Sequence, residues 1–518
     1  MLFLNPDETK IRIDIFSIFI NFPYFCDFKF QLIKPGNMKK TILKPLLTGV
    51  FLVIFSTILN AQFNISGEVK MRGEYRDGYV SLRDSSKTPY ADILGRARIL
   101  FDYKSDKITT RFSLYDAWVF GQNYYSSDTI SKNTVNVYEA WLKYNLNPAF
   151  GVKIGRMEVA YDDERLFGSS NWSMWGATHD IVIAQYESPL GNLKGDAAFA
   201  VNNTAPANAF LISYYMGRNY KYMGYLYLNK KFMQNKFTLS VMGIVDALQK
   251  PSITSSKTTV KSDTLFIRNQ NDSIIGTTIT KTNVTTTSTE EFIHTLYARA
   301  TVGAGLLFNN KKWGFFLNAY YQGGHFRDGR KLSADFFSAW VSYQVIKPLK
   351  IMAGFDHLSG NDYSDTATYK TKVTGFSTLY GTSHRGYGYM DMFTILAKDN
   401  LSPGLNDLYA RATVTMTDKM SLEATYRWFS LPYGYLAKPT KTKPYAYVEV
   451  TKSLGSEIDL MYIYKPVANF ELNMAYCIFL PTAAMEAYDG LKSGTAKFAQ
   501  YAYIMLTYKP NFFNSDKH

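Results

Sequence analysis

Residues 405–429 read LNDLYARATVTMTDKMSLEATYRWF, and this stretch decides the fold. It contains two runs in which apolar and polar side chains alternate, residues 405–416 and 421–429, separated by the turn-like residues 417–419. A period of two, with charged residues such as Arg411 on one side only, is typical of a β-strand and not of a helix. The stretch therefore predicts an antiparallel hairpin with one apolar face and one charged face.

The same alternation recurs from about residue 63 to residue 513, most clearly in 63–75 and 470–479. The connections between these runs alternate between short and long. The short ones are residues 105–106, 145–149, 188–192, 233–235, 309–311, 347–348, 417–419 and 465–469. The long ones are residues 76–91, 121–133, 161–177, 203–218, 250–292, 325–333, 359–403, 432–444 and 481–496.

This pattern predicts an all-β fold, a transmembrane antiparallel β-barrel of about eighteen strands formed by residues 62–518. An even strand number with both termini on the short-turn side is what a bacterial outer-membrane barrel requires. The apolar faces would meet lipid, and the charged faces would line a water-filled lumen. An extra strand in 208–217 is an open alternative. The inward or outward phase is ambiguous in 150–158, 219–231 and 497–510.

Residues 38–61 have the layout of a cleavable signal peptide. A basic start at Lys39 and Lys40 is followed by an apolar run, and Ala61 offers a cleavage point. The run is short for a membrane-spanning helix of ~20 residues, so an uncleaved anchor is the less favoured alternative. Residues 1–37 show no alternation, and we interpret them as an over-extended gene start that is not part of the fold.

The composition agrees with a membrane barrel. Aromatic residues make up 16% of the chain, and barrels place such side chains where the apolar band meets the lipid headgroups. The mean hydropathy of −0.17 suits a barrel because only alternate residues face lipid. Without residues 1–61 the chain has 50 Lys+Arg and 39 Asp+Glu, and this net charge of +11 indicates acidic partners, either anionic lipid or anionic solutes. Cys477 is the single cysteine of the expected barrel, which excludes an intramolecular disulfide there.

Two of the long connections differ in character. Residues 250–292 are rich in Thr and Ser with little apolar content, which predicts a mobile surface loop. Residues 359–403 place many aromatic side chains among glycines, so this segment is expected to fold onto something. We expect a constriction in the barrel mouth or lumen; an ordered lid on top of the barrel is the alternative.

Three stretches of the sequence are similar to one family of outer-membrane barrels. They are IGR at 154–156, YDDERLFG at 161–168, NW at 171–172 and HD at 179–180; LYGTSH at 379–384, GYMD at 388–391 and GLND at 404–407; and LGSEIDL at 454–460. They resemble the alginate export family, in the form common in Bacteroidetes. The resemblance implies an eighteen-stranded, porin-like barrel with an arginine-rich lumen that conducts anionic polysaccharide. Residues 176–179 depart from the family pattern because an expected arginine after the glycine is missing. The family name does not establish alginate as the solute.

Arginines expected on the inner face are the main candidates for binding an anionic solute. A guanidinium is always charged and binds carboxylates in a bidentate fork, and a series of weak sites suits conduction. These residues are Arg72, Arg96, Arg98, Arg111, Arg156, Arg299, Arg411 and Arg427. The alternative is that they pair with inward carboxylates and stabilise the wall.

A second group of candidates lies in the long loops, where we expect a role in the constriction. Its members are Arg165, His384, Arg385, Tyr389 and Asp391.

Other motifs are better explained by structure than by chemistry. The acidic run 162–164 has hard oxygen ligands for calcium, but pairing with Arg165 and Arg156 is the favoured interpretation. His179 and Asp180 form a lone pair at a strand start, which predicts a structural hydrogen bond. We therefore expect no catalytic residues, no metal and no cofactor.

The sequence thus favours a passive outer-membrane porin for anionic oligosaccharides or similar solutes, with both termini in the periplasm. Its other expected partners are outer-membrane lipid and the barrel-assembly machinery, and nucleic acid is not expected because the positive charge is spread over many strands. A barrel enzyme and a surface adhesin or structural barrel remain open as alternatives. The direction of flow also stays open.

Overall fold

The computed structural model describes residues 61–121, 135–202, 220–249, 253–268, 274–291, 295–382, 384, 386–440 and 442–515. The segment interpreted as a gene start and, apart from Ala61, the expected signal peptide lie outside the described residues, as does Arg385. Residues Asn60–His518 group into one compact unit.

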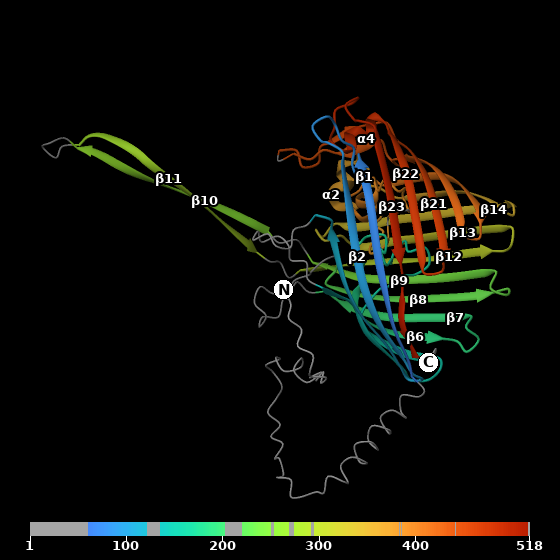
Figure 1. The fold of residues 1–518 in the computed structure, drawn as a ribbon. Coiled ribbons are helices and arrows are strands. Elements are labelled where there is room, and N and C mark those ends of the chain that lie inside the picture. Colours follow the sequence, from blue (N-terminus) through green and yellow to red (C-terminus); the bar gives the residue numbers. More distant parts are fainter. Residues whose placement is uncertain are drawn as a thin grey trace, which may run out of the picture. The chain divides into compact units, whose positions relative to one another are not determined.

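Eighteen strands of this unit, within its described part, pair edge to edge into a closed antiparallel barrel (Figure 1). They are β1 (Gln62–Asp77), β2 (Tyr90–Lys104), β3 (Ile108–Val119), β4 (Asn136–Asn145), β5 (Phe150–Met157), β6 (His179–Glu187), β7 (Leu193–Val201), β8 (Tyr222–Phe232), β9 (Phe237–Gln249), β12 (Leu296–Asn309), β13 (Trp313–His325), β14 (Lys331–Ile346), β15 (Leu349–Leu358), β17 (Leu405–Thr417), β18 (Met420–Ser430), β21 (Ser453–Val467), β22 (Phe470–Pro481) and β23 (Ala499–Tyr508). The first and last strands close the barrel, because Arg72 of β1 lies opposite Leu94 of β2 on one side and Met505 of β23 on the other. Closure leaves no unpaired sheet edge in the barrel wall.

Several short elements are not members of this ring of strands. Two strands add to the same sheet, β16 (Lys372–Val373) beside β14 and β24 (Asn511–Asn514) beside β1. The long connections also hold the strands β19 (Tyr435–Ala437) and β20 (Tyr447–Glu449) and the helices α2 (Thr366–Thr371), α3 (Thr394–Lys398) and α4 (Ala483–Tyr488). None of the helices in the described part of the chain is long and apolar enough to cross a membrane.

Burial along the strands is the reverse of that in a soluble protein. In β17 and β18, Leu408 and Tyr426 are each 50% exposed, whereas Asp407 is fully buried and Arg427 nearly so. An exposed apolar face of this kind is the face that meets lipid, and the charged side chains point inward. The alternation in the sequence therefore predicted the orientation of this hairpin correctly.

The predicted strand count and connections are confirmed. The eight short turns and the nine long connections all join the strands that the sequence pattern separated. Short turns and long loops lie at opposite ends of the barrel because the strands are antiparallel. We refer to these as the short-turn end and the long-loop end.

One long connection contains strands that the sequence analysis did not predict. Within residues 250–292, predicted as a mobile surface loop, β10 (Ile253–Arg268) pairs with β11 (Ile274–Glu291) in a regular hairpin. The reason is that the threonines that make this segment polar are β-branched, and β-branched residues favour extended backbone. The hairpin forms its own two-stranded sheet.

Candidate functional site

The interior of the barrel is occupied by the long connection between β15 and β17, residues 359–404. Its Phe376, Met390 and Phe393 are fully buried. The backbone N–H of Met390 donates to Glu457 Oε1 of β21 at 2.9 Å, and the ring of Phe393 lies 4.4 Å from that of Phe429 on β18. Because these partners are inward-facing wall residues, the segment lies within the lumen. We call residues 359–404 the inner loop.

Polar contacts also fix the inner loop to the opposite part of the wall. Arg299 of β12 donates to Asn400 Oδ1 at 2.7 Å, and Asn400 Nδ2 donates to Gln322 Oε1 of β13 at 3.1 Å. The hydroxyl of Tyr380 donates to Asp246 of β9. The inner loop is thus hydrogen-bonded to strands on several sides of the lumen.

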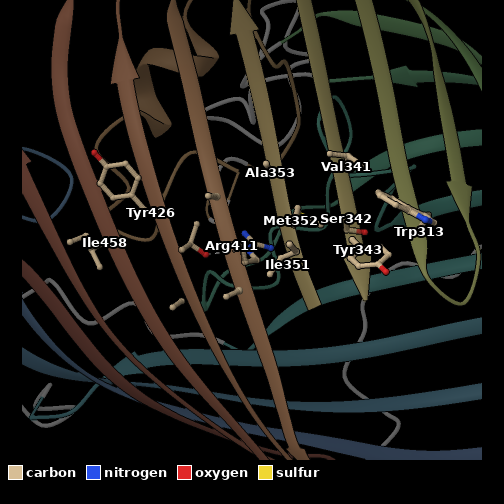
Figure 2. A pocket seen from close by; sticks show the side chains of 14 residues that line it. Trp313, Val341, Ser342, Tyr343, Ile351, Met352, Ala353, Arg411, Tyr426 and Ile458 are labelled. Atoms are coloured by element: carbon tan, nitrogen blue, oxygen red, sulfur yellow. Dashed lines mark hydrogen bonds between the residues drawn. The ribbon is translucent and has the colours of Figure 1, made fainter. Parts of the chain in front are cut away.

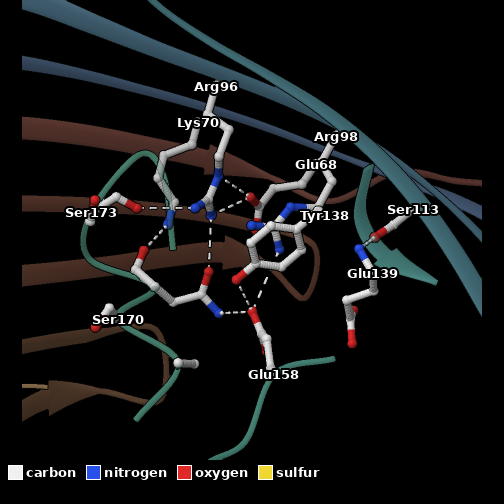
Figure 3. A network of polar contacts seen from close by, with 12 residues as sticks. Glu68, Lys70, Arg96, Arg98, Ser113, Tyr138, Glu139, Glu158, Ser170 and Ser173 are labelled. Carbon is white, nitrogen blue, oxygen red and sulfur yellow. Dashed lines mark hydrogen bonds and ion pairs between the residues drawn. The ribbon is translucent and has the colours of Figure 1, made fainter. Parts of the chain in front are cut away.

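A second connection, residues 158–178 between β5 and β6, is held by basic side chains of β1 and β2 (Figure 3). Arg96 Nη1 donates to the carbonyl of Ser173 at 3.1 Å, and Lys70 Nζ donates to the carbonyl of Asn171 at 2.7 Å. Arg96 also pairs with Glu68, with Nε and Oε1 2.8 Å apart. We call residues 158–178 the anchored loop.

The two loops meet along a short seam of backbone contacts. Phe167 and Tyr380 form a parallel β-bridge, and the N–H of Thr382 donates to the carbonyl of Glu164 at 2.9 Å. Gly381 permits this approach, because a Cβ at that position would lie 2.1 Å from the carbonyl oxygen of Arg165. The seam joins two segments that are more than 200 residues apart in the sequence.

Arg165 ties the seam to the wall. Its Nη2 lies 2.8 Å from Asp356 Oδ2 of β15, and its guanidinium carbon lies 4.8 Å from the centre of the Tyr387 ring. Burial opposes the charge, yet Asp356, with smaller contributions from Tyr387 and Asp163, holds the pKa of Arg165 well above its ordinary value. Arg165 therefore stays charged within the lumen.

Most of the arginines predicted to bind solute contact the loops or the wall. Arg72 donates to the carbonyl of Trp172 at 2.7 Å, Arg427 donates to the carbonyl of Gly386 at 3.1 Å, and Arg98 lies 3.7 Å above the Tyr138 ring. These three arginines, like Arg96 and Arg299, are almost completely buried.

Arg111 and Arg411 also point inward, and their ion pairs with described residues are made to wall residues. Arg111 pairs with Asp102 at 2.7 Å, and Arg411 lies 3.4 Å from Glu423. These two contacts agree with the alternative stated above, in which inward arginines pair with carboxylates and stabilise the wall.

Arg156 does not face the lumen, so this part of the prediction was wrong. Its side chain is 46% exposed and pairs with the exposed Asp180, with Nε and Oδ1 2.8 Å apart. It alternates with inward Gly155 and lies on the same face as Ile154, which is 52% exposed. The phase of this strand was ambiguous from its sequence, and pairing with β4 and β6 decides it.

Two of the predicted loop residues, His384 and Asp391, lie next to each other beside Trp172 of the anchored loop. The His384 ring stacks on Trp172 at 3.9 Å, and the Arg72 guanidinium also lies 4.0 Å from the centre of the Trp172 ring. His384 Nδ1 lies 2.8 Å from Asp391 Oδ1. Burial would raise the pKa of Asp391, but the neighbouring His384 and hydrogen bonds from its neighbours hold it below the ordinary value.

Tyr389 lies deeper and donates to the sulfur of Met461 at 3.4 Å. Sequence reasoning assigned no role to Trp172 or Asn400, although Trp172 stands in one of the stretches that resemble the family. Trp172 stacks on His384, more than 200 residues later in the chain, and Asn400 accepts from Arg299, 101 residues earlier. Spacing in the sequence does not reveal such distant partners.

The acidic run and the His179 motif have structural partners. Asp162 accepts from the Tyr227 hydroxyl at 2.7 Å, Asp163 pairs with Arg165, and Glu164 accepts from the Ser169 N–H at 3.0 Å. The favoured pairing with Arg165 is therefore present, whereas Arg156 pairs elsewhere. His179 Nδ1 lies 2.8 Å from the Tyr220 hydroxyl, as expected for a structural hydrogen bond. Among the described residues no three His, Cys, Asp or Glu side chains are arranged to hold a metal ion.

The loops leave a polar cavity of about 550 Å³ at the long-loop end. It lies between the seam and strands β1 to β3. Its charged lining consists of Arg72, Arg76, Lys398, Asp92, Asp391 and His384. Lys398 forms no ion pair with a described carboxylate, so the cavity combines a polar wall with a cation available to a ligand.

A second polar cavity, of about 510 Å³, lies towards the short-turn end. It is bounded by the turn at Pro148 and by Tyr161 and Asp162 of the anchored loop. Basic and acidic groups balance here, because Lys143, Lys194 and Lys231 face Asp162, Glu187 and Asp196.

A pH-dependent contact joins the first and last of the long loops. Asp489, which follows α4, accepts from the Leu82 N–H at 2.6 Å, and burial raises its pKa to about 6. A raised pKa means that the folded protein favours the protonated acid, so its contribution to stability is full below pH ~4 and is lost as the pH rises through 6.

We expect Asp489→Asn to stabilise the protein at pH 7.5 by about 1–2 kcal/mol, after allowance for solvent screening, and to have no effect at pH 4. Asparagine keeps an oxygen for the Leu82 N–H and cannot ionise. Thermal unfolding of the refolded barrel in detergent at both pH values measures this, with Asp418→Asn in an exposed short turn as the control. A gain of equal size at both pH values would contradict the assignment.

Comparison with known proteins gives a family and a fold. The family model described as alginate export matches residues 61–498. Comparison with curated proteins gave no match.

Similar solved structures include Pseudomonas aeruginosa OccK2 (OpdF), with TM-score 0.51, 11% identity and coverage of 87% of this chain and 98% of that one. P. aeruginosa OccK1 (OpdK) has TM-score 0.50, 12% identity and coverage of 86% and 99%. A BenF-like porin from Pseudomonas fluorescens has TM-score 0.50, 10% identity and coverage of 88% and 99%. At such low identity these likenesses show the barrel fold alone.

Proposed function

Because this chain belongs to the alginate export family, we propose that it is a porin-like channel of the bacterial outer membrane that passes anionic oligosaccharides or similar anionic solutes. The long-loop end faces the outside, and both termini lie in the periplasm together with the short turns, as in other bacterial barrels.

The observation that carries the proposal is the cavity at the long-loop end of a closed eighteen-stranded barrel. A barrel of this size is wide enough to enclose a water-filled path. Arg72 and Arg76 in the cavity lining both pair with the buried Glu74, and Asp92 and Asp391 also line the cavity. Lys398 is the lining cation that forms no ion pair with a described carboxylate, and a cation in a recessed site favours anions.

The seam between the inner loop and the anchored loop supports a constricted path. A solute that moves from one polar cavity to the other would pass the inner loop and the anchored loop where these loops contact the barrel wall. We therefore expect a small unitary conductance, with selectivity set in the cavity at the long-loop end.

Single-channel recording tests the proposal. The refolded chain in a planar bilayer should give small, anion-selective currents by reversal potential in a salt gradient, and oligouronate should reduce them more than a neutral oligosaccharide of equal length. Lys398→Gln should weaken both the selectivity and the block, whereas Lys443→Gln in an outer loop should not. Cation selectivity would contradict the proposal. So would equal reduction of the current by oligouronate and by the neutral oligosaccharide.

The occupied lumen favours a second candidate, a barrel that binds a ligand at its long-loop end without conducting it. Glycan-array binding by a folded barrel that stays silent in bilayers, even after the inner loop is removed, would favour this candidate. In this second candidate, the ligand would bind in the same cavity at the long-loop end.

A further inference from the structure

The outer face of the barrel carries an apolar hollow of about 720 Å³ (Figure 2). Its floor consists of four alanines on three neighbouring strands, with Ala353 opposite Ala410 and Ala412 opposite Ala424. Larger side chains wall the floor on both sides. They are Trp313, Val341 and Tyr343 on one side and Tyr426 and Ile458 on the other.

The hollow belongs to the lipid side of the wall. Trp313, Val341 and Tyr426 are exposed, whereas Ser342, Arg411 and Thr425, which lie at alternate positions on the strands of the hollow, point inward. The small side chains of the floor recede from this surface, so the packing of lipid chains around the barrel leaves a recess there. An apolar recess of this kind holds an apolar chain.

Basic residues stand at the short turns below the hollow. Lys311 and Lys312 lie in the turn before β13, Lys347 in the turn before β15 and Lys419 in the turn before β18. All four are exposed, and none forms an ion pair with a carboxylate of the described chain. The one carboxylate in these three turns is Asp418.

The depth of the hollow fits one lipid leaflet. Ala412 and Ala424 lie four or five residues from the ends of β17 and β18 at the short turn. At ~3.3 Å per residue and a tilt of ~40°, the floor lies roughly 10–15 Å from the lysines. The hydrocarbon of one leaflet is about 15 Å thick, so a chain in the hollow places its headgroup beside the turns.

We propose that the hollow and these lysines form a binding site for an anionic glycerophospholipid. One acyl chain lies on the alanine floor, between Tyr343 and Tyr426. The phosphate and the charged headgroup contact Lys347 and Lys419, with Lys311 and Lys312 at the rim. The site is independent of what the lumen conducts.

Native mass spectrometry of the refolded full chain tests the site. Phosphatidylglycerol and phosphatidylethanolamine with the same acyl chains are added in turn. We expect the barrel to retain the anionic lipid about tenfold better, since each lysine near the headgroup contributes to binding. The double variant Lys347→Gln/Lys419→Gln should lose this preference, whereas Lys107→Gln/Lys236→Gln, at short turns elsewhere, should keep it.

A second pair of variants tests the hollow itself. Ala410→Leu/Ala412→Leu fills the floor and should reduce retention of both lipids, whereas the single outward change Ala300→Leu on β12 should not. Equal retention of the two lipids by the unchanged protein would overturn the proposal. So would retention of lipopolysaccharide alone, or a stable dimer that excludes lipid from this face.

Discussion

Removal of residues 376–393 is expected to raise the unitary conductance of the barrel several-fold. This part of the inner loop places Phe376, Tyr387, Met390 and Phe393 in the lumen, each almost completely buried. Without these side chains the wall encloses a wider water-filled space, because an eighteen-stranded barrel is too large for its own wall residues to fill. Planar-bilayer recording of the deleted protein, with a short Gly/Ser linker, measures the change.

A control and a milder variant make this prediction sharper. Shortening the β10–β11 hairpin removes a similar length of chain that pairs only with itself, and it should leave the conductance unchanged. Gly381→Val should produce a partial increase, because its side chain would collide with the carbonyl of Arg165 and loosen the seam. A well-folded deletion variant with unchanged conductance would show that the inner loop does not limit the path.

Replacing Arg96 with alanine is expected to destabilise the protein by about 3–5 kcal/mol, because it removes the closest partner of the buried Glu68 carboxylate. The same change also releases the carbonyl of Ser173 and the side chain of Asn171 from their donor. Arg156→Ala is the matched control. Its ion pair with Asp180 is exposed, and such pairs contribute at most about 1 kcal/mol.

Urea unfolding in detergent micelles, followed by tryptophan fluorescence, measures both effects. The double variant Arg96→Ala/Glu68→Ala should recover much of the loss, since it removes the unpaired charge together with the pair. Equal losses for Arg96→Ala and Arg156→Ala would mean that burial of the arginine does not matter. No recovery in the double variant would assign the loss to the contacts with the anchored loop alone.

The inner loop shows how far sequence reasoning extends into the site. Its aromatic content among glycines predicted that residues 359–403 fold onto something, and lumen and lid were both open. Apolar side chains have to be buried whatever the fold, so burial could be predicted. The partners, Phe429 on β18 and Glu457 on β21, belong to strands that follow later in the chain, and local composition does not identify them.

What the sequence by itself determined is the barrel. Side-chain alternation and connection length are local properties, so a period of two with eight short turns and nine long loops suffices to predict eighteen strands. Tertiary structure decided how the charges are used. Arg96, Arg299 and Arg427 carry the pattern expected of solute-binding residues, yet their partners come from loops 41 to 101 residues away and meet them only when the barrel closes around those loops. The phase of β5, and with it the outward position of Arg156, was likewise decided by pairing with its neighbours, since its own sequence fits either face.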